Sequence, residues 1–142
     1  MVKKCSFVTA INCMDGRVQL PVINWLKENY QADYVDMITQ SGPIKLLSEN
    51  KEPGVVAAIK RCVEISVERH GSCLVAVVGH YDCAGNPVGK EEQLKQIAAA
   101  IEVVRGWGVA EKGVEVIGLW VDALGGQCCA GKVRLGQVGR VI

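Results

Sequence analysis

The chain has 142 residues, 49% of them hydrophobic, which suits one domain with its own core and no need of stabilising disulfides. With 16 Lys and Arg against 15 Asp and Glu and only 5% aromatic residues, nucleic acid and acidic membranes are excluded as main partners. No segment approaches the length of an apolar membrane span.

Predicted strands and helices alternate along the chain. Apolar runs and helical periodicity predict strands over 6–12, 34–39, 73–79 and 114–121, and helices over 20–30, 55–70 and 91–107. Residues 40–54 read as a polar loop, and the glycine-rich tail (122–142) is expected to finish with short strands. The alternation predicts a single α/β domain over 1–142, with a mainly parallel central sheet of four to five strands and helices on both faces.

The helix over 55–70 is predicted to bury one apolar stripe and to end before Gly71, a residue that suits a C-terminal cap. The stripe consists of Val55, Ile59, Cys62, Val63 and Val67. His70 lies at the same helix end, where it is predicted to interact with the helix dipole rather than to carry protons.

The chain has seven cysteines, a high and odd number. Nothing at the start of the chain resembles a signal peptide, so we expect a reducing cytoplasm and thiols that are either buried or bound to metal. Cys5, Cys62 and Cys73 fall at core positions of strands or helices and are predicted to pack as small hydrophobic residues. Cys128 and Cys129 are adjacent, so they can hardly both bind one ion with tetrahedral geometry.

Two polar segments directly follow predicted strands. They are "NCMDGR" (12–17) and "GHYDCAG" (79–85). In open parallel sheets, ligands bind beyond the carboxyl ends of the strands, near the point where the strand order reverses. These two segments are therefore the candidates for chemistry.

His80 and Cys83 leave the same predicted strand and can point both donors at one ion. Cys13 would be the third donor if the two strands are neighbours. Two thiolates and one imidazole leave a fourth position for water or a carboxylate, which is the pattern of catalytic zinc sites. The alternative is that His80 caps a helix and the cysteines are buried packing residues.

Asp15 and Arg17 lie just beyond Cys13. Arg17 could hold the Asp15 carboxylate in a bidentate pair, close to the fourth position of the ion. The alternative is a surface turn with an incidental ion pair.

Cys13-x-Asp15-x-Arg17, followed by His80-x-x-Cys83 after an apolar strand, resembles the β-class carbonic anhydrases. The resemblance extends from "FVTAINCMDGR" (7–17) through "VVGHYDCAG" (77–85) to "VIGLWVD" (116–122). It implies Zn²⁺ held by Cys13, His80 and Cys83, with Asp15 and Arg17 as the catalytic pair beside the metal-bound water. It also implies a homodimer or a larger assembly of dimers.

The expected activity is reversible hydration of carbon dioxide to bicarbonate by zinc-bound hydroxide. Carbonyl sulfide and carbon disulfide stay open as substrates, since the same nucleophile can attack their central carbon. A non-catalytic zinc-binding protein also stays open. It is suggested by a first strand that begins near residue 6, where the family has an N-terminal helical arm, and by "QSGP" (40–43), where the family often shows Ala-Gly-Asn. Ala84 likewise stands where glycine is common.

Overall fold

A computed structural model describes residues 5–124 and 127–133 of the chain. The strands are β1 (Phe7–Cys13), β2 (Tyr34–Gln40), β3 (Leu74–His80), β4 (Glu115–Leu124) and β5 (Gln127–Val133). The helices are α1 (Gln19–Tyr30), α2 (Pro43–Glu49), α3 (Pro53–His70) and α4 (Lys90–Arg105), with 3-10 turns η1 (Gly16–Val18) and η2 (Ala110–Lys112).

The strands form one five-stranded sheet in the order β2-β1-β3-β4-β5. The first four strands are parallel, and β5 is antiparallel to β4. The predicted mainly parallel α/β sheet is therefore confirmed. β5 is one of the short strands expected in the tail, while residues 134–142 lie outside the described part of the chain.

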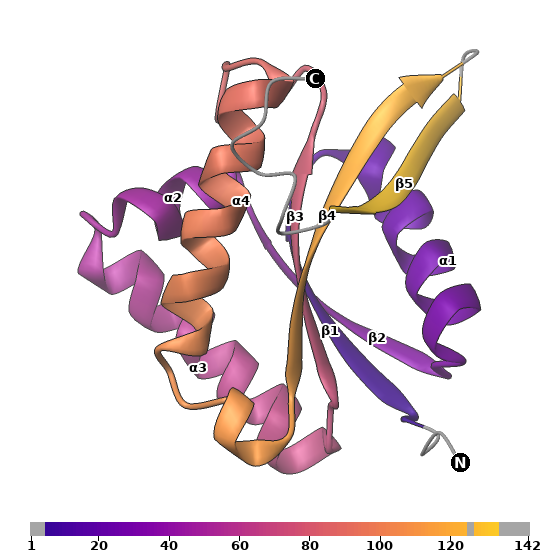
Figure 1. Cartoon of the computed structure of the whole chain (residues 1–142), viewed down its shortest axis with the longest axis vertical. Coiled ribbons are helices and arrows are strands. Elements are labelled where there is room, and N and C mark those ends of the chain that lie inside the picture. Colours follow the sequence, from indigo (N-terminus) through magenta and orange to yellow (C-terminus); the bar gives the residue numbers. More distant parts are fainter. Residues whose placement is uncertain (1–4, 125–126, 134–142) are drawn as a thin grey trace.

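Helices cover both faces of the sheet (Figure 1): α2, α3 and α4 lie on one side and α1 lies on the other. On the first side Ile59, Val63, Ile97 and Ile101 pack with the strands, while on the second side Val22 and Leu26 do so. β3 is buried at all seven residues, as its uninterrupted apolar sequence requires for a central parallel strand. None of the helices in the described ranges is long and apolar enough to cross a membrane.

Helix α2 lies within residues 40–54, where the sequence predicts a polar loop. It begins after Gly42, whose φ of 61° is left-handed, and Pro43 occupies its first turn. Pro43, Ile44 and Leu47 are buried. Seven residues make only two turns, too few for helical periodicity to stand out, so packing decides this element.

The buried face of α3 differs from the predicted stripe. Its buried residues are Val56, Ile59, Val63 and Ser66, and Gly71 caps the helix as expected. Cys62 is exposed, so the prediction that it packs in the core is wrong.

Ser66 is the polar residue of this buried face, and its hydroxyl oxygen lies 2.6 Å from Thr9 Oγ1 and 2.6 Å from Asp36 Oδ2. Asp36 also lies 2.6 Å from Nδ1 of His70, so His70 pairs with a carboxylate on β2 beyond its expected role at the helix end. These hydrogen bonds join α3 to the neighbouring strands β1 and β2.

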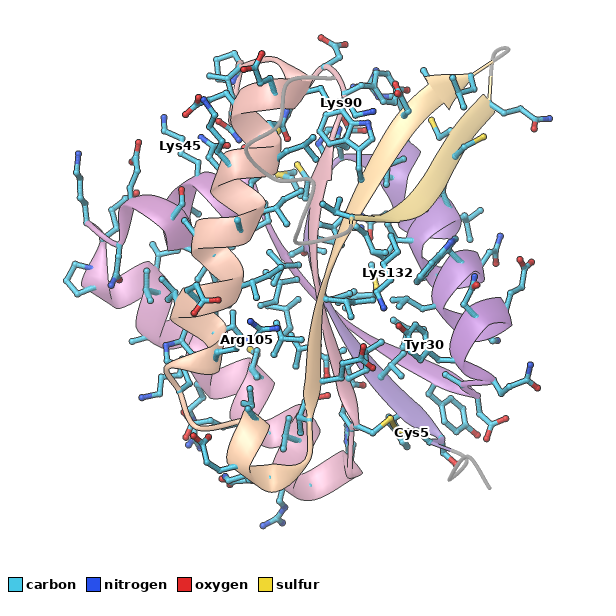
Figure 2. The ribbon with its side chains drawn as sticks, in the orientation of Figure 1. Cys5, Tyr30, Lys45, Lys90, Arg105 and Lys132 are labelled. Atoms are coloured by element: carbon cyan, nitrogen blue, oxygen red, sulfur yellow. A yellow bond between two sulfur atoms is a disulfide. The ribbon has the colours of Figure 1, made fainter. Side chains whose placement is uncertain are left out.

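Cys5 and Cys73 form a disulfide, which corrects the expectation of two free packing residues. They are 68 residues apart in sequence, with Cα atoms 6.1 Å apart. Parallel pairing of β1 with β3, in which Thr9 lies opposite Val75, brings them together. Figure 2 shows Cys5 close to the N-terminal end of the described chain, at the opposite end of the sheet from Lys90.

Candidate metal centre

The candidate metal centre lies where the strand order reverses. From β1 the chain moves outward to β2, whereas from β3 it moves in the opposite direction to β4. The carboxyl ends of β1 and β3 therefore flank the crevice in which open α/β sheets bind ligands. Cys13 is the last residue of β1, His80 is the last residue of β3, and Cys83 follows in the next turn.

The three donor atoms form a compact buried cluster. All three lie within 4.8 Å of one another, and the Sγ atoms of Cys13 and Cys83 are 3.8 Å apart. Two sulfur atoms bound tetrahedrally to zinc at about 2.3 Å are separated by about 3.8 Å. Exposure is 4% for each cysteine and 1% for His80. The sulfur spacing therefore suits one tetrahedral ion.

His80 has the tautomer that a ligand needs. Its Nδ1 atom lies 2.6 Å from the carbonyl oxygen of Tyr81, and since a carbonyl only accepts, Nδ1 carries the proton. Nε2 is buried and has no hydrogen-bond partner among the described residues. Burial lowers the pKa of His80, which favours the neutral ring. A metal ion bound to Nε2 would supply the partner that this nitrogen atom lacks.

The electrostatic environment of the two thiols, Cys13 and Cys83, also favours binding of a cation. Burial, together with the neighbouring Cys13, raises the pKa of Cys83 to about 11. A buried thiolate is unfavourable next to a second sulfur unless a positive charge compensates it. A divalent ion would supply that charge and favour both thiolates, so the donor set fits zinc chemically as well as geometrically.

Gln93 on α4 fixes the backbone of His80, and sequence reasoning missed it. Its Oε1 accepts the His80 N–H at 3.2 Å, while its Nε2 donates to the carbonyl oxygens of His80 at 2.8 Å and Val88 at 3.2 Å. Gln93 is 1% exposed. It lies one turn before Ile97 on the apolar face of α4, so an amide at a core position was the available signal.

A second glutamine positions the turn after Cys13. The Nε2 atom of Gln19 donates to the carbonyl oxygens of Cys13 at 2.6 Å and Asp15 at 3.1 Å. Asn12 donates from its side chain to the carbonyl oxygen of Val18 at 3.1 Å. The turn that carries Asp15 is thereby held at both ends.

Asp15 and Arg17 form the pair expected from the sequence. Nη2 and Nε of Arg17 donate to the carboxylate of Asp15 at 2.7 Å and 3.1 Å, and the backbone N–H of Arg17 donates to it at 2.9 Å. The hydrogen bond from the Arg17 side chain is the main cause that lowers the pKa of Asp15 to about 2. The pKa of Arg17 is raised by the same hydrogen bond. Asp15 is therefore ionised at neutral pH.

The segment "QSGP" brings α2 against the loop that follows Cys83. A side chain at Gly42 would place its Cβ 2.9 Å from the backbone carbon of Gly85. In the same loop Asn86 is buried, and its Nδ2 donates to Oε1 of Gln96 at 2.6 Å. Glycine at position 42 is thus a condition for the close packing beside the cluster.

The fold and the cluster define an α/β protein with a Cys-His-Cys site at the switch point of a mainly parallel sheet. Residues 3–131 match the family model described as "Putative carbonic anhydrase", and the chain belongs to this family. None of the curated proteins compared with the chain matches it significantly.

Solved structures of carbonic anhydrases share the fold. The β-carbonic anhydrase CafA of Aspergillus fumigatus is 16% identical, with a TM-score of 0.50, covering 94% of this chain and 77% of its own. The carbonic anhydrase of Streptococcus mutans is 18% identical, with a TM-score of 0.50 and coverages of 92% and 82%. The β-carbonic anhydrase isoform I of Trichomonas vaginalis is 13% identical, with a TM-score of 0.55 and coverages of 89% and 82%. The β-carbonic anhydrase-like fold predicted from the sequence is confirmed.

Proposed function

We propose that the protein is a zinc-dependent carbonic anhydrase, a lyase that interconverts carbon dioxide and bicarbonate. The observation that carries the proposal is the buried Cys13–His80–Cys83 cluster with the unpaired Nε2 of His80. Family membership supports the same reading. Cys13, His80 and Cys83 would hold the ion. When bound, zinc supplies a Lewis acid that brings the pKa of water toward neutrality.

In this proposal Asp15 and Arg17 orient the attacking water. Three protein donors leave one position open for water or substrate, as in other catalytic zinc sites. Asp15 is ionised, so its carboxylate can only accept hydrogen bonds and would align a water molecule by holding one of its protons. Arg17 keeps that carboxylate charged and in one orientation.

The first test combines metal analysis with kinetics on the wild-type chain. Protein purified without chelator should contain about one zinc per chain, the number that a single three-donor cluster can hold. Stopped-flow assays should then show rapid hydration of carbon dioxide.

Two other outcomes separate the alternatives. Hydrolysis of carbonyl sulfide or carbon disulfide without hydration of carbon dioxide would assign a different substrate. Full zinc content with none of these activities would identify a non-catalytic zinc protein.

A homodimer or a larger assembly is part of the proposal. Four exposed apolar side chains lie near the carboxyl end of the sheet, namely Met14, Leu20, Val88 and Leu124. A second copy of the chain would remove them from water. Sedimentation equilibrium should find a dimer or a multiple of it, and Leu20→Glu should weaken association. The control Ile65→Glu alters another exposed apolar residue, on α3, and should associate like the wild type.

A cytoplasmic location completes the proposal, and the Cys5–Cys73 disulfide provides its test. Glutathione and thioredoxin keep most cytosolic thiols reduced. Acid quenching of cells, alkylation and mass spectrometry should therefore find Cys5 and Cys73 mostly as thiols. A fully formed disulfide in vivo would instead favour an oxidising compartment.

A further inference from the structure

The guanidinium group of Arg17 contacts more than Asp15. Tyr81 and Asp82, the two residues that separate the donors His80 and Cys83, also lie against it. Arginine has five N–H donors in one plane, so its two edges and its face can be occupied at the same time.

Asp82 accepts hydrogen bonds from Nη1 of Arg17, which Asp15 does not contact, and from Nη2, which it shares with Asp15. Nη1 of Arg17 donates to Oδ2 of Asp82 at 3.3 Å, and Nη2 donates to the backbone carbonyl of Asp82 at 3.1 Å. Asp82 has a φ of 48°, a left-handed backbone that is uncommon outside glycine and best tolerated by Asp and Asn. In this conformation both the carbonyl and the carboxylate of Asp82 contact Arg17.

Tyr81 contacts the face of the same group. The Cζ atom of Arg17 lies 4.9 Å from the centre of the Tyr81 ring, within the range of a cation–π interaction. The ring is itself anchored, because the Tyr81 hydroxyl lies 3.1 Å from Sγ of Cys128 on β5. The backbone N–H of Tyr81 donates to the carbonyl of Val121 on β4 at 3.1 Å. Arg17 therefore rests on a surface supported by two strands.

We propose that Tyr81 and Asp82 are positioning residues that clamp Arg17 and thereby fix the direction of the Asp15 carboxylate. Their role in catalysis rests on the proposed function, whereas the contacts by which they clamp Arg17 do not depend on it. The Asp82 carboxylate is 81% exposed, and such an ion pair is weak by itself. The carbonyl contact and the ring contact act on the same rigid plane, so the three together restrict Arg17 more than the ion pair alone.

Asp82 acts together with Asp15 and does not compete with it. The two carboxylates contact different nitrogen atoms, Nε and Nη2 for Asp15 and Nη1 for Asp82. The shorter contact, 2.7 Å, belongs to Asp15. Removal of Asp82 should therefore loosen Arg17 without transferring it to another carboxylate.

The test measures Arg17 directly, by NMR exchange of its Nε–H proton with water. Tyr81→Leu removes the ring face and Asp82→Asn removes the charge while tolerating the left-handed backbone. Each should accelerate this exchange about two- to fivefold, as expected for loss of one exposed cation–π contact or one exposed ion pair. The exchange is measured on both zinc-loaded and metal-free protein.

Two controls separate the clamp from general damage to the fold. Tyr81→Phe keeps the ring that contacts Arg17 and loses only the hydroxyl contact with Cys128, so its Arg17 exchange should rise less than that of Tyr81→Leu. Glu68→Gln removes a carboxylate from an exposed pair with Lys112, near the amino ends of β3 and β4 and away from Arg17 at the carboxyl end of β1, and should not change the exchange of Arg17.

Activity then tests the positioning role. In both clamp variants kcat/KM for carbon dioxide should fall by a factor similar to the change in exchange, with the zinc content unchanged. Unaltered Arg17 exchange in both variants would overturn the proposal, as would faster exchange with an unchanged kcat/KM in an active enzyme. Faster exchange in a protein that acts on none of the substrates would overturn the proposed function and leave the clamp standing.

Discussion

At the scale of single residues, two of the three candidate donors, Cys13 and His80, are held by neighbours that supply no ligand atom. Gln93 holds the backbone of His80, Gln19 holds the carbonyl of Cys13, and the Tyr81 carbonyl orients the His80 ring. Such contacts restrict the donors before any ion binds, so less ordering is needed on binding. Replacing a donor and replacing a residue that holds a donor should therefore affect zinc binding differently.

Replacing a donor should abolish metal binding. Cys83→Ser removes one of the two thiolates, and a hydroxyl is a poor substitute at neutral pH, so zinc content should fall from about one per chain to nearly none. Cys62→Ser is the matched control, since Cys62 is a free and exposed cysteine on α3. Elemental analysis after dialysis measures the zinc content, and full zinc in Cys83→Ser would contradict the assignment of Cys83 as a donor.

Replacing Gln93 should weaken zinc binding without removing a ligand. Gln93→Leu leaves the buried N–H and carbonyl of His80 unpaired, which should lower the free energy of unfolding by about 2–4 kcal/mol. Zinc affinity should fall about tenfold or more, as for other supporting groups. Chelator competition measures the affinity and urea denaturation measures the stability.

Gln96→Leu is the contrast on the same helix. It leaves the buried amide of Asn86 unpaired and should also destabilise the fold, by about 1–3 kcal/mol. Within the described part of the chain, the hydrogen bonds of Gln96 join it to Asn86 and not to His80, so the zinc affinity of this variant should be that of the wild type once the protein is folded. Equal losses of affinity in both variants would mean that Gln93 acts only through stability.

At the scale of elements, close packing contacts determine the short elements that sequence periodicity does not predict. Helix α2 and strand β5 are defined by packing, α2 against α4 and the loop after β3, and β5 by pairing with β4. The long elements, by contrast, were predictable, since β3 is wholly apolar and α4 presents a regular buried face. The ends of the predicted strands and helices differ from the observed ones by at most three residues.

The start of α2 should not tolerate a side chain. Gly42→Ala combines a left-handed backbone with a Cβ 2.9 Å from the backbone of Gly85, so the free energy of unfolding should fall by about 2 kcal/mol or more. Gly54→Ala in α3, where nothing lies within 4 Å, should instead raise it by about 0.5 kcal/mol. Denaturant titration of both variants checks the prediction, and equal effects would contradict it.

The contact between α3 and η2 should make stability depend on pH. Lys112 lies 2.7 Å from Glu68, and this hydrogen bond lowers the pKa of Glu68 and raises that of Lys112. The stabilisation is present above the unfolded pKa of Glu68, about 4.3, and is lost as pH falls through the lowered folded value. At the alkaline end it is present below the unfolded pKa of Lys112, about 10.4, and is lost as pH rises through the raised folded value.

Lys112→Ala should therefore lower the melting temperature slightly at neutral pH, and this difference should shrink toward acid pH as Glu68 becomes protonated. The effect is small because both side chains are half exposed. Thermal melts of the variant and the wild type across this pH range provide the measurement. A difference that persists unchanged at pH 3 would assign the effect to something other than the ion pair.

At the scale of the whole molecule, two long-range connections lie at the two ends of the neighbouring strands β1 and β3. The Cys5–Cys73 disulfide links the chain at the amino ends of β1 and β3, and the metal cluster would link the same strands at their carboxyl ends. Neither connection is local in sequence. The disulfide restricts the unfolded chain, whereas a bound metal ion would stabilise the folded chain, in which its donors are brought together.

Loss of the disulfide should destabilise the fold in oxidising buffer only. For a loop of 68 residues, Cys5→Ser combined with Cys73→Ser should lower the free energy of unfolding by about 4 kcal/mol. In buffer with excess dithiothreitol, the wild type and the double variant should unfold together. Cys62→Ser serves as the control in both buffers, and a difference that survives full reduction would indicate lost packing.

The sequence by itself determined the alternation of strands and helices, the parallel sheet and the two motifs at strand ends, because apolar periodicity and strand boundaries are local properties of a chain. It also indicated Cys13, His80 and Cys83 as possible donors and Asp15 with Arg17 as a pair. Only the tertiary structure decided which distant groups meet. The disulfide, the hydrogen bonds of Gln93 and the contacts of Arg17 with Tyr81 and Asp82 all depend on strand order and register, which no single segment encodes.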